Sequence, residues 1–282
     1  MLFAGIDVGS ATAKAVVLRK TTAPSPGPTV LPGLGHALEL TGWAILPTGY
    51  DMAAAGERAL EEALGRARAR AEAKGDFPPP ERVVATGYGR SALRADRAVT
   101  EITCHARGAS VLVPGVGTVV DVGGQDSKGI AVGPGGRVLD FVMNDKCAAG
   151  TGRFLEVMAR ALEVPLEEFG LAALRAERAA PITNICTVFA ESEVVSLRAS
   201  RRPREEIAAG IHQAMARRIA GMARRLDLRP PVVMTGGVAR NVGLVRALET
   251  ELGLPVIVPE LAQLAGALGA AVLAAQVEEE PG

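Results

Sequence analysis

The stretch that decides the fold is VDVGGQDSK at residues 120–128, which has an ungapped counterpart, IDVGSATAK, at residues 6–14. Asp7 and Asp121 lie 114 positions apart, and each is followed by a glycine turn and a second apolar run. A strand, a tight turn and a second strand form the pattern of a β-hairpin. Because an internal repeat reveals the plan of a chain, this one predicts two related lobes, each opening with a hairpin.

The repeated turns have the composition of phosphate-binding loops. Glycine lets a backbone approach a phosphate without a Cβ clash, and successive turn N–H groups form an anion-binding concavity. A strand-end aspartate holds Mg²⁺ through its water shell, so Asp7 and Asp121 are predicted to organise Mg²⁺ and the attacking water. An ordinary glycine-rich hairpin is the alternative, and the second copy favours phosphate binding. The predicted phosphate-contacting residues are Gly9, Ser10, Lys14, Gly123, Gly124 and Gln125.

A third glycine loop, TGGVARN at residues 235–241, follows an apolar strand and precedes a helix. A glycine pair there allows adenosine to pack against backbone, and the start of the helix adds partial positive charge. Gly236, Gly237 and Asn241 are therefore predicted to lie on the adenosine side. No Gly-x-x-x-x-Gly-Lys-Ser/Thr pattern occurs in the sequence, so the chain is not a P-loop NTPase.

The three loops, in this order, resemble those of the acetate kinase, sugar kinase, Hsp70 and actin superfamily. The resemblance implies an α/β fold: a bilobal actin-like ATPase with two ribonuclease-H-like lobes that clamp Mg-ATP. We expect an N-terminal lobe at residues 1–113, with a proline-rich hairpin loop at 21–35, and a C-terminal lobe at 114–282. Such a fold is shared by kinases, chaperones and filaments, so it leaves the function open.

Composition excludes several classes of protein. Of 282 residues, 48% are apolar, which is enough for a substantial core, and the 31 basic residues balance the 31 acidic ones. A broad electrostatic nucleic-acid binder needs a basic excess, and 3% aromatic residues are too few for base-stacking platforms.

Residues 1–6 lack the basic region of a secretory signal, and no apolar run reaches the length of a membrane span. We therefore expect a cytoplasmic protein with reduced thiols and without a disulfide framework.

Two of the three cysteines, Cys147 and Cys186, each stand just ahead of a predicted helix. A thiolate at a helix N-terminus has a lowered pKa and is a good metal ligand. An iron–sulfur cluster of the 4Fe–4S type usually takes four cysteines. A two-fold dimer would supply four and place the cluster on its axis. Buried structural cysteines are the alternative, and position alone does not decide between the two.

The sequences around these cysteines resemble those of one family. The segments are DKCAAGTGRFLE at 145–156 and CTVFAESEV at 186–194. The family is that of the ATP-dependent activator components of 2-hydroxyacyl-CoA dehydratases, which includes the ATP-hydrolysing subunits of benzoyl-CoA reductase (the BadF/BadG/BcrA/BcrD ATPase family). The repeat at 120–128 and the third loop fit it as well.

This resemblance implies a homodimer with one 4Fe–4S cluster between the subunits, in which Cys147 and Cys186 match the ligand positions. It also implies that ATP hydrolysis drives one electron to an iron–sulfur dehydratase or reductase of CoA thioesters. The electron would come from a donor such as ferredoxin or flavodoxin. Cys104 is expected to be a non-ligand near the lobe junction, and His105 beside it a structural or supporting group.

Two other functions remain compatible with the loops. A small-molecule kinase of the same fold would need a substrate pocket and a base, but not paired cysteines at helix starts. An actin-like binding module would use ATP as a switch. A brown colour after anaerobic purification would favour the electron-transfer ATPase, and a colourless protein would favour the others. The sequence does not specify which dehydratase or reductase is the partner.

Overall fold

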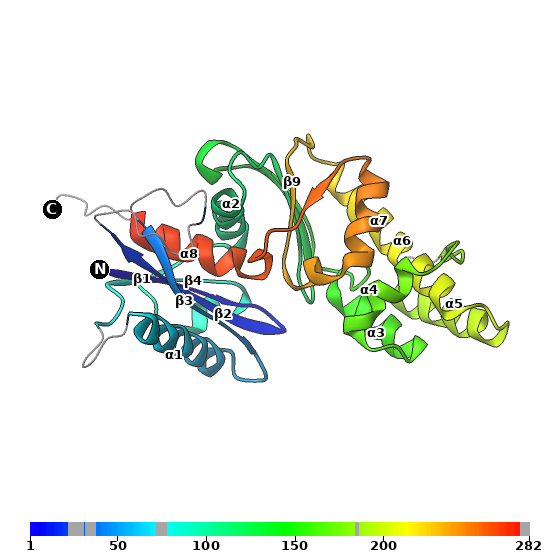
Figure 1. Cartoon of the computed structure of the whole chain (residues 1–282), viewed down its shortest axis with the longest axis horizontal. Helices are drawn as coiled ribbons and strands as arrows, with labels where there is room; N and C mark the ends of the chain where they lie inside the picture. Colours follow the sequence, from blue (N-terminus) through cyan, green and yellow to red (C-terminus); the bar gives the residue numbers. More distant parts are fainter. Residues whose placement is uncertain (22–30, 32–37, 72–77, 184–185, 277–282) are drawn as a thin grey trace. The chain divides into compact units, whose positions relative to one another are not determined.

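The computed structural model describes residues 1–21, 31, 38–71, 78–183 and 186–276. Its contacts divide these residues into two compact units (Figure 1). The first unit contains the described residues of Met1–Val116, Val132–Val138 and Glu260–Gly282, and the second contains those of Gly117–Ala131 and Leu139–Pro259. The units correspond to two five-stranded sheets.

The sheet of the first unit has the order β3-β2-β1-β4-β5. Strand β1 pairs with β2 in antiparallel fashion and with β4 in parallel fashion, so it lies in the middle of the sheet. The strands are β1 (Leu2–Val8), β2 (Thr12–Lys20), β3 (Leu38–Pro47), β4 (Arg82–Thr86) and β5 (Arg97–Ala98).

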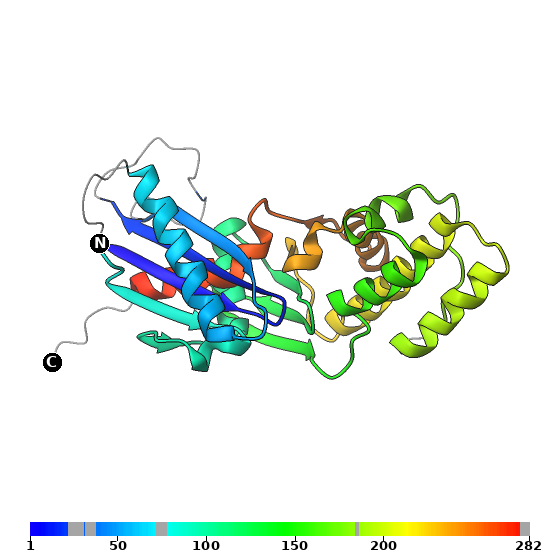
Figure 2. The ribbon, with the colours of Figure 1, turned by 90° about the horizontal axis from the view of Figure 1, so that it is seen from below.

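Helices cover both faces of this sheet. Helix α1 (Met52–Arg70) lies across the strands (Figure 2) and packs a stripe of four buried alanines against Ala15 and Val17 of β2. The neighbouring residues Val16 and Leu18 point to the other face, where α2 (Glu101–Leu112) and α8 (Ala265–Gln276) cover them. This division follows from the alternation of side chains along a strand.

The second sheet repeats the pairing of the first, with the order β10-β9-β6-β7-β8. Strand β6 pairs with β7 in antiparallel fashion and with β9 in parallel fashion, as β1 does with β2 and β4. The two predicted hairpins are therefore confirmed, and the repeat extends to the third strand of each sheet. The strands are β6 (Thr118–Val122), β7 (Ser127–Val132), β8 (Val138–Asn144), β9 (Val232–Thr235) and β10 (Val256–Ile257).

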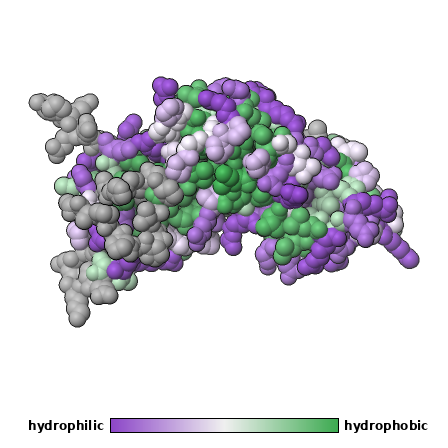
Figure 3. All heavy atoms as spheres, turned by 45° about the horizontal axis from the view of Figure 1, so that its top comes forward, coloured by the Kyte–Doolittle hydropathy of each residue, from purple (hydrophilic) through white to green (hydrophobic). Residues whose placement is uncertain are grey.

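Five α-helices accompany the second sheet in the part of the chain that the structure describes. They are α3 (Gly152–Leu162), α4 (Leu166–Leu174), α5 (Thr187–Ala199), α6 (Arg204–Ala223) and α7 (Val242–Leu252). Helix α6 buries a stripe formed by Ile207, Ile211, Met215 and Ile219. Helix α5 buries only Ala190 and Val194. Hydrophobic surface lies between hydrophilic areas in Figure 3. Helix α5 exposes Val188, Phe189 and Val195.

The chain returns to the first unit at its C-terminal end. Residues 260–276 pack with β1, β2 and β4, although they fall within the predicted C-terminal lobe, 114–282. Helix α8 is apolar except for Gln276, and most of its residues are buried between the sheet and α2. The predicted proline-rich loop at 21–35 lies outside the described residues, apart from Thr21 and Leu31. Within the described residues, no helix has the length and apolar composition needed to cross a membrane.

Candidate functional site

Asp7 lies near the end of β1, directly opposite Lys14 of β2. Its side chain is buried, and the ammonium of Lys14 donates a hydrogen bond of 3.0 Å to Asp7 Oδ2. A buried charge is tolerated when it is paired and hydrogen-bonded. The turn that follows is closed by a hydrogen bond of 3.0 Å from Gly9 N to the carbonyl oxygen of Thr12, which places Ser10 within the turn.

Asp121 occupies the same place in the second unit, opposite Lys128 of β7. The Lys128 ammonium lies 3.4 Å from Asp121 Oδ2 and 2.9 Å from Asp126 Oδ1, and it is 1% exposed. The hydroxyl of Thr235 donates a hydrogen bond of 2.8 Å to the other oxygen of Asp121. Residues of β7 and β9 therefore both hold this carboxylate in place.

Each carboxylate packs against a glycine that follows the neighbouring parallel strand. Gly87 has φ +82° and Gly236 has φ +88°, which L side chains rarely adopt. A Cβ at Gly87 would lie 2.6 Å from Asp7 Oδ1, and one at Gly236 would lie 2.9 Å from Asp121 Oδ1. The third glycine loop thus has a counterpart in the first unit. The sequence contained a signal for it, because β4 and β9 both end in a threonine that is followed by a glycine.

Helices α2 and α8 add a group beside Asp7 that sequence reasoning did not place there. A Cβ on Gly266 of α8 would lie 2.7 Å from Asp7 Oδ2 and 2.9 Å from His105 Nε2. Both side chains therefore border the same glycine, and both are buried. Cys104, the preceding residue of α2, is fully buried in the interior of the first unit, and burial raises the pKa of its thiol to about 12.

This shift predicts a loss of stability in alkali. The ordinary thiol pKa is 9.0, so the folded state holds the proton more tightly than the unfolded state. The contribution is complete below pH 9 and disappears as the pH rises from 9 toward 12. The free energy of unfolding should fall by about 2 kcal/mol more in the wild type than in Cys104→Ala between pH 8 and about pH 10.5. Urea titrations of both proteins measure this, and parallel pH profiles would contradict it.

The second turn is hydrogen-bonded to the helix that follows Cys147. Gly152 N donates to the carbonyl oxygen of Gly123 at 2.8 Å, and Arg153 N donates to that of Gly124 at 2.9 Å. Two of the N–H groups that lack partners within the first turn of a helix are therefore satisfied by the predicted phosphate loop. The next residue of the loop, Gln125, is exposed.

The third loop is held by the cap of α7. The side-chain oxygen of Asn241 accepts a hydrogen bond of 2.9 Å from Leu244 N, as an N-cap residue does. The same oxygen lies 3.1 Å from Nε2 of His212 on α6, whose Nδ1 lies 2.8 Å from the carbonyl oxygen of Ala208. Asn241 thus fixes the loop, and His212 is a supporting residue that the sequence did not indicate. The predicted contact of Asn241 with adenosine remains a prediction.

Both predicted cluster ligands belong to the second unit. Cys186 is exposed and is the N-cap residue of α5, which starts at Thr187. Cys147 is half-buried in the turn before α3. Asn144 Nδ2 donates to its carbonyl oxygen at 2.8 Å.

The described residues contain no group of three or more His, Cys, Asp or Glu side chains placed to hold a metal ion. Two accessible thiols in one chain fit a four-thiolate cluster only if a second chain supplies the other two.

Two sheets with one connectivity, each with a buried Asp-Lys hairpin beside a glycine turn, define the class of this protein. It is a two-lobe α/β protein of the actin-like ATPase class, with ribonuclease-H-like lobes. Residues 4–274 match the BadF/BadG/BcrA/BcrD ATPase family, and the chain belongs to that family.

Its similar proteins include dehydratase activators. It is 41% identical over 272 residues to the 2-hydroxyisocaproyl-CoA dehydratase activator of Clostridioides difficile, covering 96% of this chain and 93% of that one. It is also 41% identical over 272 residues to the (R)-2-hydroxyglutaryl-CoA dehydratase activating ATPase of Acidaminococcus fermentans, covering 96% and 95%. A solved structure of the activator of the 2-hydroxyisocaproyl-CoA dehydratase from Clostridium difficile with bound ADPNP is 38% identical. Its TM-score is 0.84, and the match covers 97% of this chain and 94% of that one.

Proposed function

We propose that this protein is an ATP-hydrolysing activator that passes single electrons to an iron–sulfur dehydratase or reductase acting on CoA thioesters. The names of the similar proteins support this class of partner. Because those names give different acyl groups, the proposal leaves the substrate of the partner open. The small-molecule kinase alternative is not favoured, since a kinase has no use for an exposed and a half-buried cysteine that each precede a helix.

Mg-ATP is assigned to the two hairpins and the third loop. Asp7 and Asp121 organise Mg²⁺ and the attacking water, while Lys14 and Lys128 hold the two carboxylates in place. Phosphoryl transfer depends mainly on positioning and charge stabilisation, and residues fixed by a strand ladder suit that role. The proposed phosphate contacts are Gly9, Ser10, Lys14, Gly123, Gly124 and Gln125, and the proposed adenosine contacts are Gly236, Gly237 and Asn241.

The observation that carries the proposal is the link between the second turn and α3. Gly123 and Gly124 accept hydrogen bonds from Gly152 and Arg153, and Cys147 lies five residues before that helix begins. A phosphate that moves this turn therefore also moves the start of α3. These hydrogen bonds support a coupling between the proposed phosphate site and the cysteine segment.

A 4Fe–4S cluster shared by two copies of the chain is the electron carrier in this proposal. Cys147 and Cys186 of each copy would hold it, and when bound it supplies one-electron transfer at low potential. Ferredoxin or flavodoxin is the proposed class of electron donor. Cluster exposure and hydrogen bonding both influence the reduction potential, so the surroundings of the two cysteines matter as much as the thiols themselves.

The nucleotide state is expected to control the cluster. A ligand shifts an equilibrium only by its differential affinity for the two states, so ATP must favour a state that ADP does not. Anaerobically purified protein should be brown. Its midpoint potential should be lower, or its affinity for the partner higher, with a non-hydrolysable ATP analogue than with ADP. Redox titrations and binding assays measure both quantities. Identical values in the two nucleotide states would eliminate this gating.

A further inference from the structure

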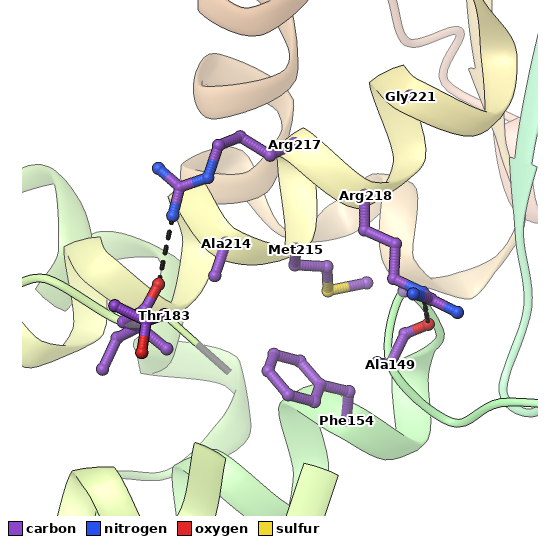
Figure 4. Close-up of a pocket in the computed structure, with 10 residues that line it drawn as sticks. Ala149, Phe154, Thr183, Ala214, Met215, Arg217, Arg218 and Gly221 are labelled. Atoms are coloured by element: carbon purple, nitrogen blue, oxygen red, sulfur yellow. Dashed lines mark hydrogen bonds between the residues drawn. The ribbon is translucent and has the colours of Figure 1, made fainter. Parts of the chain in front are cut away.

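One helix, α6, contacts the segments of both cysteines and the third loop. Arg218 Nε donates to the carbonyl oxygen of Ala149 at 2.8 Å, and Arg217 Nη2 donates to that of Ile182 at 3.2 Å. Figure 4 shows the two arginines leaving α6 in different directions, with Met215 and Phe154 between them. Met215, Phe154 and both arginines line a cavity of about 420 Å³.

The two carbonyls lie close to the cysteines along the chain. Ala149 is two residues after Cys147, and its oxygen also accepts a hydrogen bond of 3.1 Å from Asn144 Nδ2. Ile182 is four residues before Cys186. The residue after Ile182, Thr183, donates its backbone N–H to the carboxylate of Glu193 on α5 at 3.0 Å. Each cysteine segment is therefore tied to α6 by a charged donor and to its own surroundings by a second contact.

The same helix also reaches the third loop. His212, which lies six residues before Arg218, has its Nε2 atom 3.1 Å from the side-chain oxygen of the N-cap residue Asn241. With a rise of about 1.5 Å per residue, these two contacts lie roughly 9 Å apart along the helix axis. The buried apolar stripe of α6 fixes the helix against its unit. A shift at one contact is therefore transmitted to the others by a rigid element.

We propose that Arg217 and Arg218 are positioning residues that set the geometry of the two cysteine segments, and that His212 connects them through α6 to the nucleotide loop. This proposal rests on the proposed function, because it concerns the cysteines assigned to the cluster. Arg218 is the stronger contact, since its hydrogen bond is shorter and its side chain is half-buried, whereas Arg217 is exposed. Hydrogen bonds from charged donors are stronger than those between neutral groups.

The test compares Arg218→Ala, Arg217→Ala and His212→Gln with the wild type. In anaerobic protein, the rate at which a chelator removes iron is measured with ADP and with a non-hydrolysable ATP analogue. Arg218→Ala should release iron about fivefold to tenfold faster and lose the difference between the nucleotides, as expected for a lost hydrogen bond from a charged donor. Arg217→Ala should have a smaller effect. His212→Gln should lose the nucleotide difference while keeping its iron.

Two further variants separate positioning from loss of the fold. Arg218→Lys keeps a charged donor and should restore most of the wild-type behaviour. Arg204→Ala changes an exposed arginine at the start of the same helix and should behave as the wild type. If Arg218→Ala does not fold, Arg217→Ala and His212→Gln carry the test.

A second measurement needs no cluster. After chelation, each protein is treated with iodoacetamide, and labelling of Cys147 and Cys186 is quantified by peptide mass spectrometry, with buried Cys104 as the unreactive reference. Arg218→Ala should change the labelling rate of Cys147 about severalfold. If the wild type contains no iron, the proposed function fails, and altered labelling still supports the positioning role. Equal iron release and equal labelling in the wild type, Arg218→Ala and Arg204→Ala would overturn the proposal.

Discussion

Replacing Asp121 or Asp7 with asparagine is expected to slow ATP hydrolysis by about 100-fold or more, because each change removes a charge that organises Mg²⁺ and the attacking water. Asparagine keeps the size of the side chain and an oxygen that can accept the hydrogen bond from Thr235 at Asp121. The loss should therefore appear mainly in kcat. Phosphate release at saturating Mg-ATP measures it, and full turnover in both variants would show that the site is wrong.

A matched control is Asp51→Asn, which changes an exposed aspartate that caps α1. Asparagine caps a helix as well as aspartate does, so turnover and stability should not change.

The two site variants, Asp7→Asn and Asp121→Asn, should also differ from each other in stability. Lys128 keeps Asp126 at 2.9 Å when Asp121 is neutralised, whereas Lys14 forms its salt bridge within the described residues with Asp7. Since a buried unpaired charge is costly, Asp7→Asn should lower the free energy of unfolding more than Asp121→Asn.

The sequence predicted what is local and repeated. Asp7 faces Lys14 and Asp121 faces Lys128 because a tight turn fixes the register of a hairpin. The sequence patterns did not predict helix α2, although Thr100 provides an N-cap and Glu101 an acidic residue in the first turn. Helix α2 owes its place to close packing rather than to a stripe of large apolar residues.

Small residues explain both that packing and the position of α8. A Cβ at Gly108 of α2 would lie 1.9 Å from the carbonyl oxygen of Ala265, and one at Gly269 of α8 would lie 1.8 Å from that of Cys104. A helix of almost entirely apolar residues is predicted to be buried, but its sequence does not show which sheet it packs against. The return of α8 to the first unit could therefore not be predicted from the residues of that helix.

The site also combines local features, which the sequence predicts, with contacts between distant segments, which it does not. The residues of the turns are read from sequence because glycine and aspartate have specific roles at strand ends. The contacts of His212, Arg217 and Arg218 join segments 29 to 69 residues apart through backbone carbonyls and one amide. Every residue has a backbone carbonyl. The sequence of a segment therefore does not show which of its carbonyls accepts a hydrogen bond from a distant side chain.

Cys147→Ser and Cys186→Ser are each expected to abolish the iron of the purified protein, whereas Cys104→Ser should leave it largely intact. Iron analysis and the visible spectrum of anaerobic protein measure this. The wild type should contain about four iron atoms per dimer. About four per monomer would contradict a cluster shared between two chains, since the described second unit of one chain offers two cysteines.

The position of Cys186 makes this experiment sharper than an ordinary cysteine scan. Cys186 is the N-cap residue of α5, and its side chain makes no capping hydrogen bond. Serine is among the best N-cap residues, so Cys186→Ser should preserve or raise the stability of α5 while it removes a ligand. A cluster-free protein that unfolds no more easily than the wild type would then have lost its iron through the ligand and not through the fold. Full iron content in Cys186→Ser would remove this residue from the site and would contradict a cluster held by these two cysteines of each chain.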